Sequence, residues 1–345
     1  MKNISLVRRL VSISFPAILA IPALWAQMPS HVPIPKDNPQ TPAKIELGKQ
    51  LYFDPRVSST GTVSCNSCHD VLSNGTDNRP VSMGVHGKLG SRNAPTVFNA
   101  AFHSVQFWDG RAASLEEQAK GPVTNPVEMG MPNAEVIVAR MKAIPGYGRE
   151  FEQVFGGPEP VTMDHIAQAI ASFERTLITS ASPYDRFMEG DKSVLTPAAQ
   201  RGLKLVESIG CTGCHSGPMF NGPEMPMGQG YYMKFPLNAD NEYVKKYNLM
   251  ADLGRYDVTH QDADKHMFVV QSLRNVEVTA PYFHNGSVKD LHEAVRVMAK
   301  TQLNRTLTEA QVRDLVAFLD SLTGGFPHIS MPRLPETPNT TPLGM

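Results

Sequence analysis

Two short motifs with the same chemistry lie far apart in the sequence. The first motif runs from Cys65 to His69, the second motif runs from Cys211 to His215, and both read Cys-x-x-Cys-His. Together they use all four cysteines of the chain. Two thiols at this spacing can add across the vinyl groups of a haem, and the adjacent imidazole can bind the iron. The sequence therefore predicts two covalently attached haems. The attachment points are Cys65, Cys68, Cys211 and Cys214, and the iron ligands are His69 and His215.

Two other uses of the cysteines fit the sequence less well. A four-cysteine zinc site would have to join pairs separated by 142 residues, and it would leave both histidines without a role. Thioredoxin-like redox motifs would need a surrounding β-α-β pattern, which the sequence does not show. Covalent haem is the interpretation that uses every residue of both motifs.

Composition does not determine the second axial ligand of either iron. Histidine or methionine can complete a haem that carries electrons, and the chain has 11 histidines and 17 methionines. His86 lies in a glycine-flanked loop that could reach the first haem, although a lone histidine of this kind is more often a surface residue. Met298 follows apolar residues at helical spacing, so a core position is equally consistent with it, and Met267 is a competing candidate.

Two other side chains could take part in chemistry. Trp108 is the only tryptophan after residue 26, and a core or interface position is its default interpretation. Glu128 could act as a general acid and base or could be a solvated loop carboxylate. From the residues alone, the solvated carboxylate is favoured.

The elements that position these residues follow a repeated plan. Thr41-Pro42 and Thr196-Pro197 each begin a predicted helix upstream of a motif, with threonine as N-cap and proline at the first helical position. Closing helices are predicted over 164–179 and 308–323. No sustained strand alternation is present, so the predicted fold is mainly α, with long irregular loops.

This plan predicts two haem domains between an export signal and a tail. The predicted boundaries are 1–26 for the signal, 27–185 and 186–323 for the domains, and 324–345 for a Pro-rich tail. The signal has a basic start and an apolar stretch that two prolines interrupt, with cleavage expected near residue 26; an uncleaved anchor is the alternative.

The charge balance excludes some classes of function. The whole chain has a net charge of −1, and removal of the signal leaves 29 Lys and Arg against 33 Asp and Glu, a net charge of −4. A dedicated nucleic-acid binder would usually carry a basic excess. No later apolar run is long enough for a membrane span. We therefore expect an exported, mildly acidic protein without nucleic acid as a partner.

From about residue 47 to 322, the sequence resembles the bacterial dihaem cytochrome c peroxidases. Both motifs carry this resemblance, together with an ordered series of further segments. These segments are Leu51–Arg56, Arg92–Thr96, Phe107–Arg111, Glu117–Ala119, Asn125–Met129, Leu273–Val276 and Thr279–His284. The block from 219 to 264 matches the family less well.

The resemblance implies two cytochrome c-like domains, and it implies a role for each candidate residue. His86 resembles the removable distal ligand of the peroxide-reducing N-terminal haem, and Met298 resembles the axial ligand of the electron-entry C-terminal haem. Trp108 matches the aromatic residue between the haems, and Glu128 and Gln118 match polar residues of the peroxide pocket. The family also binds one calcium ion, at positions that correspond to Asn93, Thr279 and Pro281.

The activity that this resemblance implies is reduction of hydrogen peroxide to water in the periplasm. Electrons would come from a small cytochrome c or cupredoxin, and the family suggests a homodimer. One alternative is a dihaem oxidase that modifies a protein substrate, as in the methylamine-utilisation relatives, which carry tyrosine where this chain has Met298. The other alternative is a simple dihaem electron carrier.

Overall fold

The computed structural model describes residues 27–337, and helices dominate this part of the chain. The α-helices are α1 (Pro42–Phe53), α2 (Leu115–Thr124), α3 (Ala134–Lys142), α4 (Pro145–Phe155), α5 (Met163–Glu174), α6 (Pro183–Met188), α7 (Pro197–Ser208), α8 (Glu242–Lys246), α9 (Tyr256–Thr259), α10 (Leu291–Leu303) and α11 (Glu309–Asp320). Strands β1 (Tyr232–Lys234) and β2 (Met267–Val269) pair antiparallel. The expectation of a mainly α chain is confirmed. None of the helices within residues 27–337 is long and apolar enough to cross a membrane.

Short 3-10 helices and loops connect these elements. The 3-10 helices are η2 (Pro55–Val57), η3 (Cys65–Ser67), η4 (Val85–Gly87), η5 (Ala100–Phe102), η6 (Cys211–Gly213), η7 (Asp262–Asp264) and η8 (Val276–Val278). The predicted export signal over 1–26 and residues 338–345 of the predicted tail lie outside the described residues.

The helices that precede the two motifs begin as the sequence predicts. The Thr41 hydroxyl accepts a hydrogen bond from the Lys44 amide at 3.2 Å, and the Thr196 hydroxyl accepts one from the Ala199 amide at 3.1 Å. Each cap satisfies an amide that the first helical turn would leave unpaired. The closing helices α5 and α11 each end several residues before the predicted end.

The same helix crossing occurs twice in the molecule. Helix α1 packs against α5, and α7 packs against α11. At each crossing a glycine lets the backbones meet: a Cβ atom on Gly48 would lie 1.8 Å from the Ala169 carbonyl oxygen, and one on Gly202 would lie 1.9 Å from that of Asp314. Any larger residue would push the paired helices apart, so both glycines are structural requirements of the crossing.

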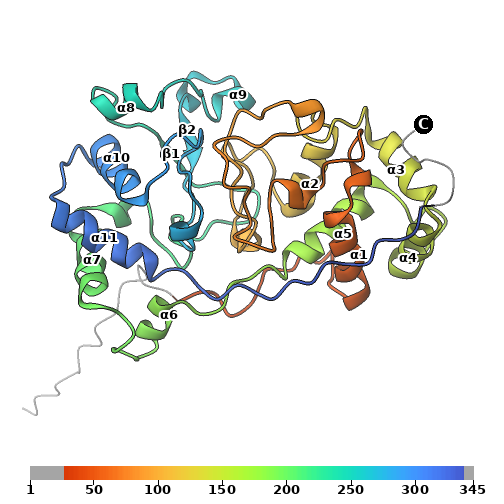
Figure 1. Cartoon of the computed structure of the whole chain (residues 1–345), viewed down its shortest axis with the longest axis horizontal. Helices are drawn as coiled ribbons and strands as arrows, with labels where there is room; N and C mark the ends of the chain where they lie inside the picture. Colours follow the sequence, from red (N-terminus) through yellow and green to blue (C-terminus); the bar gives the residue numbers. More distant parts are fainter. Residues whose placement is uncertain (1–26, 338–345) are drawn as a thin grey trace, which may run out of the picture.

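The molecule has two large apolar clusters, one in each of the two halves that lie side by side in Figure 1. The buried members of the first come from residues 47–177 and those of the second come from residues 184–322. The aromatic centre of the first is Tyr52 against Phe173, with ring centroids 5.2 Å apart; that of the second is Tyr184 against Phe318, at 5.9 Å. The exact domain boundaries stay a prediction.

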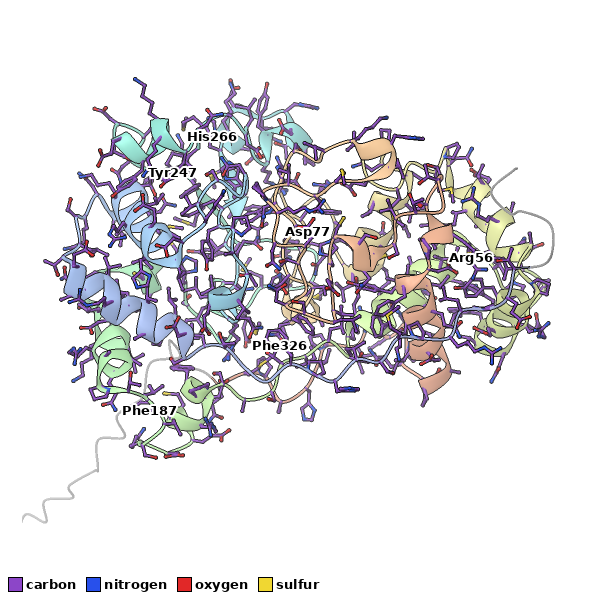
Figure 2. All side chains as sticks on the ribbon, viewed as in Figure 1. Arg56, Asp77, Phe187, Tyr247, His266 and Phe326 are labelled. Atoms are coloured by element: carbon purple, nitrogen blue, oxygen red, sulfur yellow. The ribbon has the colours of Figure 1, made fainter. Side chains whose placement is uncertain are left out.

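The described part of the predicted tail, residues 324–337, forms no helix or strand, and we call it the C-terminal strap. It leaves α11 in the second half and runs back along the first half (Figure 1). The Ser180 amide donates to the Gly325 carbonyl at 2.7 Å, and the Phe326 ring packs edge-on against Phe98 at 4.7 Å. Figure 2 shows Phe326 on the strap between the two halves. The strap therefore joins the two halves of the molecule through contacts that lie outside their helical cores.

Candidate functional site

The first motif presents its histidine in a form that can bind a metal. Residues Cys65–Ser67 form a single 3-10 turn, and the His69 amide donates to the Cys65 carbonyl at 3.0 Å. The His69 Nδ1 atom lies 2.9 Å from the Pro95 carbonyl oxygen. Because a carbonyl can only accept, Nδ1 carries the hydrogen and Nε2 keeps its lone pair. Burial also lowers the pKa of His69, which favours the neutral ligand form.

The second motif is built in the same way. Its Cys211–Gly213 turn is again a 3-10 helix, and His215 Nδ1 lies 2.9 Å from the Phe220 carbonyl oxygen. Burial lowers the pKa of His215 as well. Both histidines are therefore oriented by a backbone carbonyl, which leaves Nε2 of each ring as the available ligand atom.

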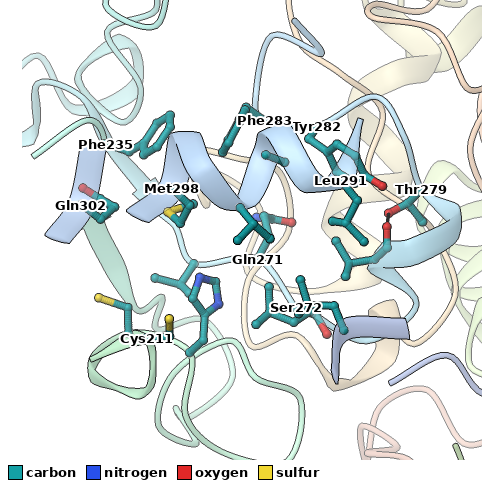
Figure 3. A pocket seen from close by; sticks show the side chains of 18 of the residues that line it. Cys211, Phe235, Gln271, Ser272, Thr279, Tyr282, Phe283, Leu291, Met298 and Gln302 are labelled. Carbon is teal, nitrogen blue, oxygen red and sulfur yellow. Dashed lines mark hydrogen bonds between the residues drawn. The ribbon is translucent and has the colours of Figure 1, made fainter. Parts of the chain in front are cut away.

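A cavity of about 280 Å³, which we call the apolar cavity, adjoins the second motif. Cys211, Cys214, His215 and Met298 all line it. Figure 3 shows Met298 projecting from α10 into the space that Cys211 also borders. Met267 does not line this cavity. The arrangement favours Met298 over Met267 as the methionine closer to the second motif.

The polar atoms of this cavity fit a bound haem. His103 Nε2 and His284 Nε2 are buried and have no hydrogen-bond partner among the described residues, and both rings line the apolar cavity. Burial lowers the pKa of each to about 4, so both rings are neutral at pH 7. Buried polar atoms are nearly always paired in native proteins. The carboxylates of a haem are suitable acceptors for such atoms, and the chemistry of the cysteines, His215 and Met298 is suitable for covalent attachment and iron binding.

Glu128 lies near the first motif. Burial raises the pKa of the Cys68 thiol, and the carboxylates of Asp77 and Glu128 raise it further. The Asn125 side-chain amide donates to Glu128 Oε1 at 2.8 Å, whereas Oε2 accepts no hydrogen bond from the described residues. Burial raises the pKa of Glu128 itself, opposed by Arg111 and by the Asn125 hydrogen bond. Glu128 is thus a partly buried carboxyl with one oxygen fixed and one free.

His86 lies at the tip of a hairpin that touches the Glu128 segment. We call residues 83–89 the His86 hairpin: Met83 pairs with Leu89, and His86 is exposed with φ of 58°. The Val85 amide donates to the Glu128 carbonyl at 2.8 Å, and a Cβ atom on Gly84 would lie 2.4 Å from the same oxygen. The structure therefore brings the His86 hairpin and the Glu128 backbone together.

A second cavity, of about 530 Å³, lies between the first motif and the His86 hairpin, and we call it the polar cavity. Its lining residues are Thr62, Val63, Asn66, Ser67, Asp70, Thr76, Asp77, Asn78, Arg79, Met83 and Gly84. Neither described cavity is lined by Cys65, Cys68, His69, His86, Gln118 or Glu128. Backbone contacts thus join the His86 hairpin to the Glu128 segment, and neither described cavity gathers the first-motif candidates.

Trp108 occupies a position between the halves. Its indole nitrogen donates to the Asn93 carbonyl at 2.9 Å, and its carbonyl accepts from the Val269 amide of β2 at 2.9 Å. The indole ring lies edge-on to His284, with centroids 6.4 Å apart. Trp108 also lines the apolar cavity, so it connects the Asn93 loop of the first half with the second motif's surroundings.

The three predicted calcium positions all border the apolar cavity. Asn93, Thr279 and Pro281 all line it, and the Asn93 amide donates to the His284 carbonyl at 2.7 Å. The Asn93 side-chain oxygen and the carbonyls of Thr279 and Pro281 have no hydrogen-bond donor among the described residues. Neutral oxygens of this kind are suitable calcium ligands. Within the described part of the chain, no cluster of three His, Cys, Asp or Glu could hold a metal ion.

Sequence reasoning did not identify Asn125 or His103 as neighbours of the site. For one predicted residue, the structure shows no side-chain hydrogen bond. Gln118 lies on α2, and its side chain makes no hydrogen bond within residues 27–337, so its place in the site stays a prediction. The role of Asn125 has a sequence signal, because an amide three residues before a carboxylate can bond to it across a turn. No such signal identifies His103, because its importance depends on a cavity formed by distant segments.

Comparisons with known proteins show which family this chain is similar to. A family model described as di-haem cytochrome c peroxidase matches residues 42–193. The cytochrome c551 peroxidase of Nitrosomonas europaea is 43% identical over 335 residues, which cover 96% of this chain and 96% of that protein. The cytochrome c551 peroxidase of Pseudomonas aeruginosa is 40% identical, over 93% of this chain and 90% of that protein.

The fold also resembles solved structures. A MauG-like protein associated with microbial copper homeostasis matches with a TM-score of 0.74 and 30% sequence identity. The match covers 86% of this chain and 95% of that chain. The similarity therefore extends over both motifs and both halves of the molecule.

Proposed function

Because this chain belongs to the di-haem cytochrome c peroxidase family, we propose that it reduces hydrogen peroxide to water with electrons from a small redox protein. Each turnover takes two electrons and two protons and converts one peroxide molecule into two waters. The single observation that carries the catalytic assignment is Glu128, a partly buried carboxyl with one free oxygen whose charge raises the pKa of Cys68 in the first motif.

The two motifs would hold the two c-type haems that the family implies. Cys65, Cys68 and His69 would hold the first, and Cys211, Cys214 and His215 would hold the second. Bound haem would supply an iron that exchanges single electrons and can bind peroxide. Met298, at the apolar cavity, would complete the second iron; a thioether ligand raises a haem's potential, which suits the site where electrons enter.

Glu128 would move the proton that peroxide cleavage needs. The Asn125 amide occupies Oε1, so Oε2 can take a proton from the peroxide oxygen nearer the haem and return it to the distal oxygen, which leaves as water. Burial supports this exchange because it raises the pKa of the carboxyl toward the working pH. Gln118 would help to orient peroxide, as the resemblance to the family implies.

His86 would be the ligand that leaves the first haem when the second is reduced. Its position at a hairpin tip, exposed and with positive φ, supports a residue that can move without disturbing a core. We therefore expect faster peroxide binding in half-reduced than in fully oxidised enzyme. Trp108 would carry electrons between the halves, and its contacts with the Asn93 loop and β2 support that placement.

The remaining assignments concern the surroundings of the enzyme. We propose a periplasmic location after removal of residues 1–26, a homodimer, and one calcium ion held by Asn93, Thr279 and Pro281. The net charge of −4 after signal removal favours a donor with a positive patch, a cytochrome c or a cupredoxin. Electron transfer from such a donor should slow as salt is added, because salt screens the attraction.

The decisive experiment is peroxide-dependent oxidation of a reduced cytochrome c by the purified holoenzyme and by Glu128→Gln. Loss of the proton-transfer group should lower peroxide turnover by about 10²–10⁴-fold, with haem content unchanged. Glu117→Gln, an exposed glutamate on α2 that pairs with Lys120 at 2.7 Å, is the matched control. Full turnover in Glu128→Gln would remove the catalytic assignment, and absence of turnover in the wild type would remove the peroxidase function.

A further inference from the structure

Four methionines in the described part of the chain are exposed to solvent. Their exposed fractions are 46% for Met83, 49% for Met227, 38% for Met250 and 63% for Met331. A methionine thioether reacts with peroxide to give a sulfoxide, which is polar where the thioether is apolar. If exposure alone decided this reaction, Met331 would react first and Met83 would not stand out.

Met83 differs from the other three in its surroundings. It lines the polar cavity, whose wall also includes Asn66 and Ser67 of the first motif. Met227, Met250 and Met331 line neither of the described cavities. Peroxide drawn to the first motif would therefore pass closer to the Met83 sulfur than to the other exposed thioethers.

Met83 also supports the His86 hairpin. It pairs with Leu89, which is 62% exposed, so two apolar side chains lie opposite each other at the base of the hairpin. The pairing is held by hydrogen bonds from the Gly84 amide to the Lys88 carbonyl at 2.8 Å and from the Gly90 amide to the Ser82 carbonyl at 2.9 Å. A sulfoxide oxygen at Met83 would be a strong acceptor beside these bonds and would weaken the apolar pair.

We propose that Met83 is a modification site: hydrogen peroxide converts it to the sulfoxide before the other exposed methionines, and this loosens the His86 hairpin. The inference rests on the proposed function because it takes peroxide as the substrate that gathers at the first motif. In the reaction the peroxide O–O bond breaks and one oxygen bonds to sulfur. The sulfur lone pair forms the new S–O bond, and the departing oxygen takes the O–O bonding pair and leaves as water with both protons, so sulfur is oxidised by two electrons and the peroxide is reduced by two.

Mass spectrometry of the holoenzyme treated with peroxide in the absence of donor tests the site. Met83 sulfoxide should form several-fold faster than the sulfoxide at Met331 or Met227. Oxidation in the order of exposure, with Met331 first, would overturn the inference. Turnover with a reduced cytochrome, measured on the same sample, tests the proposed function separately, because an active enzyme that oxidises Met331 first loses only the inference.

Hydrogen exchange over residues 83–90 tests the consequence. After peroxide treatment, exchange should accelerate in the wild type and in Met227→Leu, whereas Met83→Leu should keep its original rate because leucine is apolar and cannot be oxidised. Reduction of the sulfoxide by a methionine sulfoxide reductase should restore slow exchange in the wild type. Equal acceleration in Met83→Leu, or unchanged exchange in fully oxidised wild type, would overturn the link to the hairpin.

Discussion

At the scale of single residues, burial sets the protonation of two carboxyl groups in the first half. Glu128 keeps one hydrogen bond, from Asn125, and its pKa is raised by burial. Glu174, at the end of α5, is 5% exposed, and its Oε2 atom has no hydrogen-bond partner among the described residues. Burial raises the pKa of Glu174 to about 8, although Arg175 opposes the shift. Charging Glu174 therefore opposes folding.

The raised pKa of Glu174 predicts how its carboxyl affects stability as pH changes. Between the ordinary value of 4.5 and about 8, the folded chain holds a proton at this site that the unfolded chain releases. The free energy of unfolding therefore falls as pH rises through this window, and the contribution of Glu174 is constant below it. Glu174→Gln cannot titrate, so it should gain thermal stability relative to the wild type as pH rises from 5 to 8.

Thermal unfolding of both proteins across that range measures the difference. Glu152→Gln, which removes an exposed carboxyl from α4, controls for the loss of one negative charge. Parallel pH profiles for the wild type and Glu174→Gln would contradict the prediction.

Individual site residues could be predicted from the sequence only where the chemistry is local. The motif residues are such a case, because two thiols and an imidazole act together within five positions. His103 and His284 are the opposite case: each matters because its Nε2 atom is buried beside the apolar cavity without a partner. That condition depends on how segments far apart in sequence pack, so composition and spacing carry no sign of it.

At the scale of elements, the paired helix crossings predict the effect of adding one methyl group. Gly48→Ala and Gly202→Ala would each place a Cβ atom under 2 Å from a backbone carbonyl oxygen of the partner helix. The helices would have to separate, so we expect each variant to lose about 1–3 kcal/mol of unfolding free energy or more. Chemical denaturation measures this loss.

Gly148 in α4 is the matched control, because a Cβ atom there would meet nothing within 4 Å. Gly148→Ala should stabilise the chain by about 0.4–1 kcal/mol, since alanine restricts the unfolded chain more than glycine does. Equal stability changes at Gly48 and Gly148 would show that the crossing does not depend on the glycine.

The elements themselves were predictable to the extent that their ends carry local signals. Thr41 and Thr196 cap α1 and α7 as predicted, because a hydroxyl before a proline is a strong start signal. The ends of α5 and α11 came earlier than predicted. After α5 the Leu177 amide donates to the Glu174 carbonyl, three residues back, and after α11 the Leu322 amide donates likewise to the Leu319 carbonyl. The backbone after each helix therefore tightens into a turn, which apolar periodicity does not reveal.

At the scale of the whole molecule, contacts outside the helical cores hold the two halves together. Arg92 of the first half pairs with Asp252 of the second at 2.6 Å, and the Trp108 carbonyl accepts a hydrogen bond from the Val269 amide of the second half at 2.9 Å. The C-terminal strap adds a third connection, through the edge-on contact of Phe326 with Phe98. The sequence predicted an irregular tail there, but a proline-rich segment without periodicity does not indicate which surface it covers.

Removal of the strap should therefore weaken the first half, although the strap follows the last helix of the second. Its farther contacts are with helices of the first half: the Lys49 ammonium lies 3.2 Å from the Ser330 hydroxyl, and Pro335 fills the space beside Gly146. A chain that ends at Thr323 should lose thermal stability, and Phe326→Ala alone should cost about 1–3 kcal/mol of unfolding free energy because a partly buried aromatic side chain is lost.

Hydrogen exchange locates the effect of removing the strap. Exchange should quicken in α1 more than in α7, which does not contact the strap through these residues. A chain that ends at Thr337 keeps every strap contact and is the matched control. Equal acceleration of hydrogen exchange in α1 and α7 would contradict the prediction, because the strap would then stabilise the whole molecule and not the first half in particular.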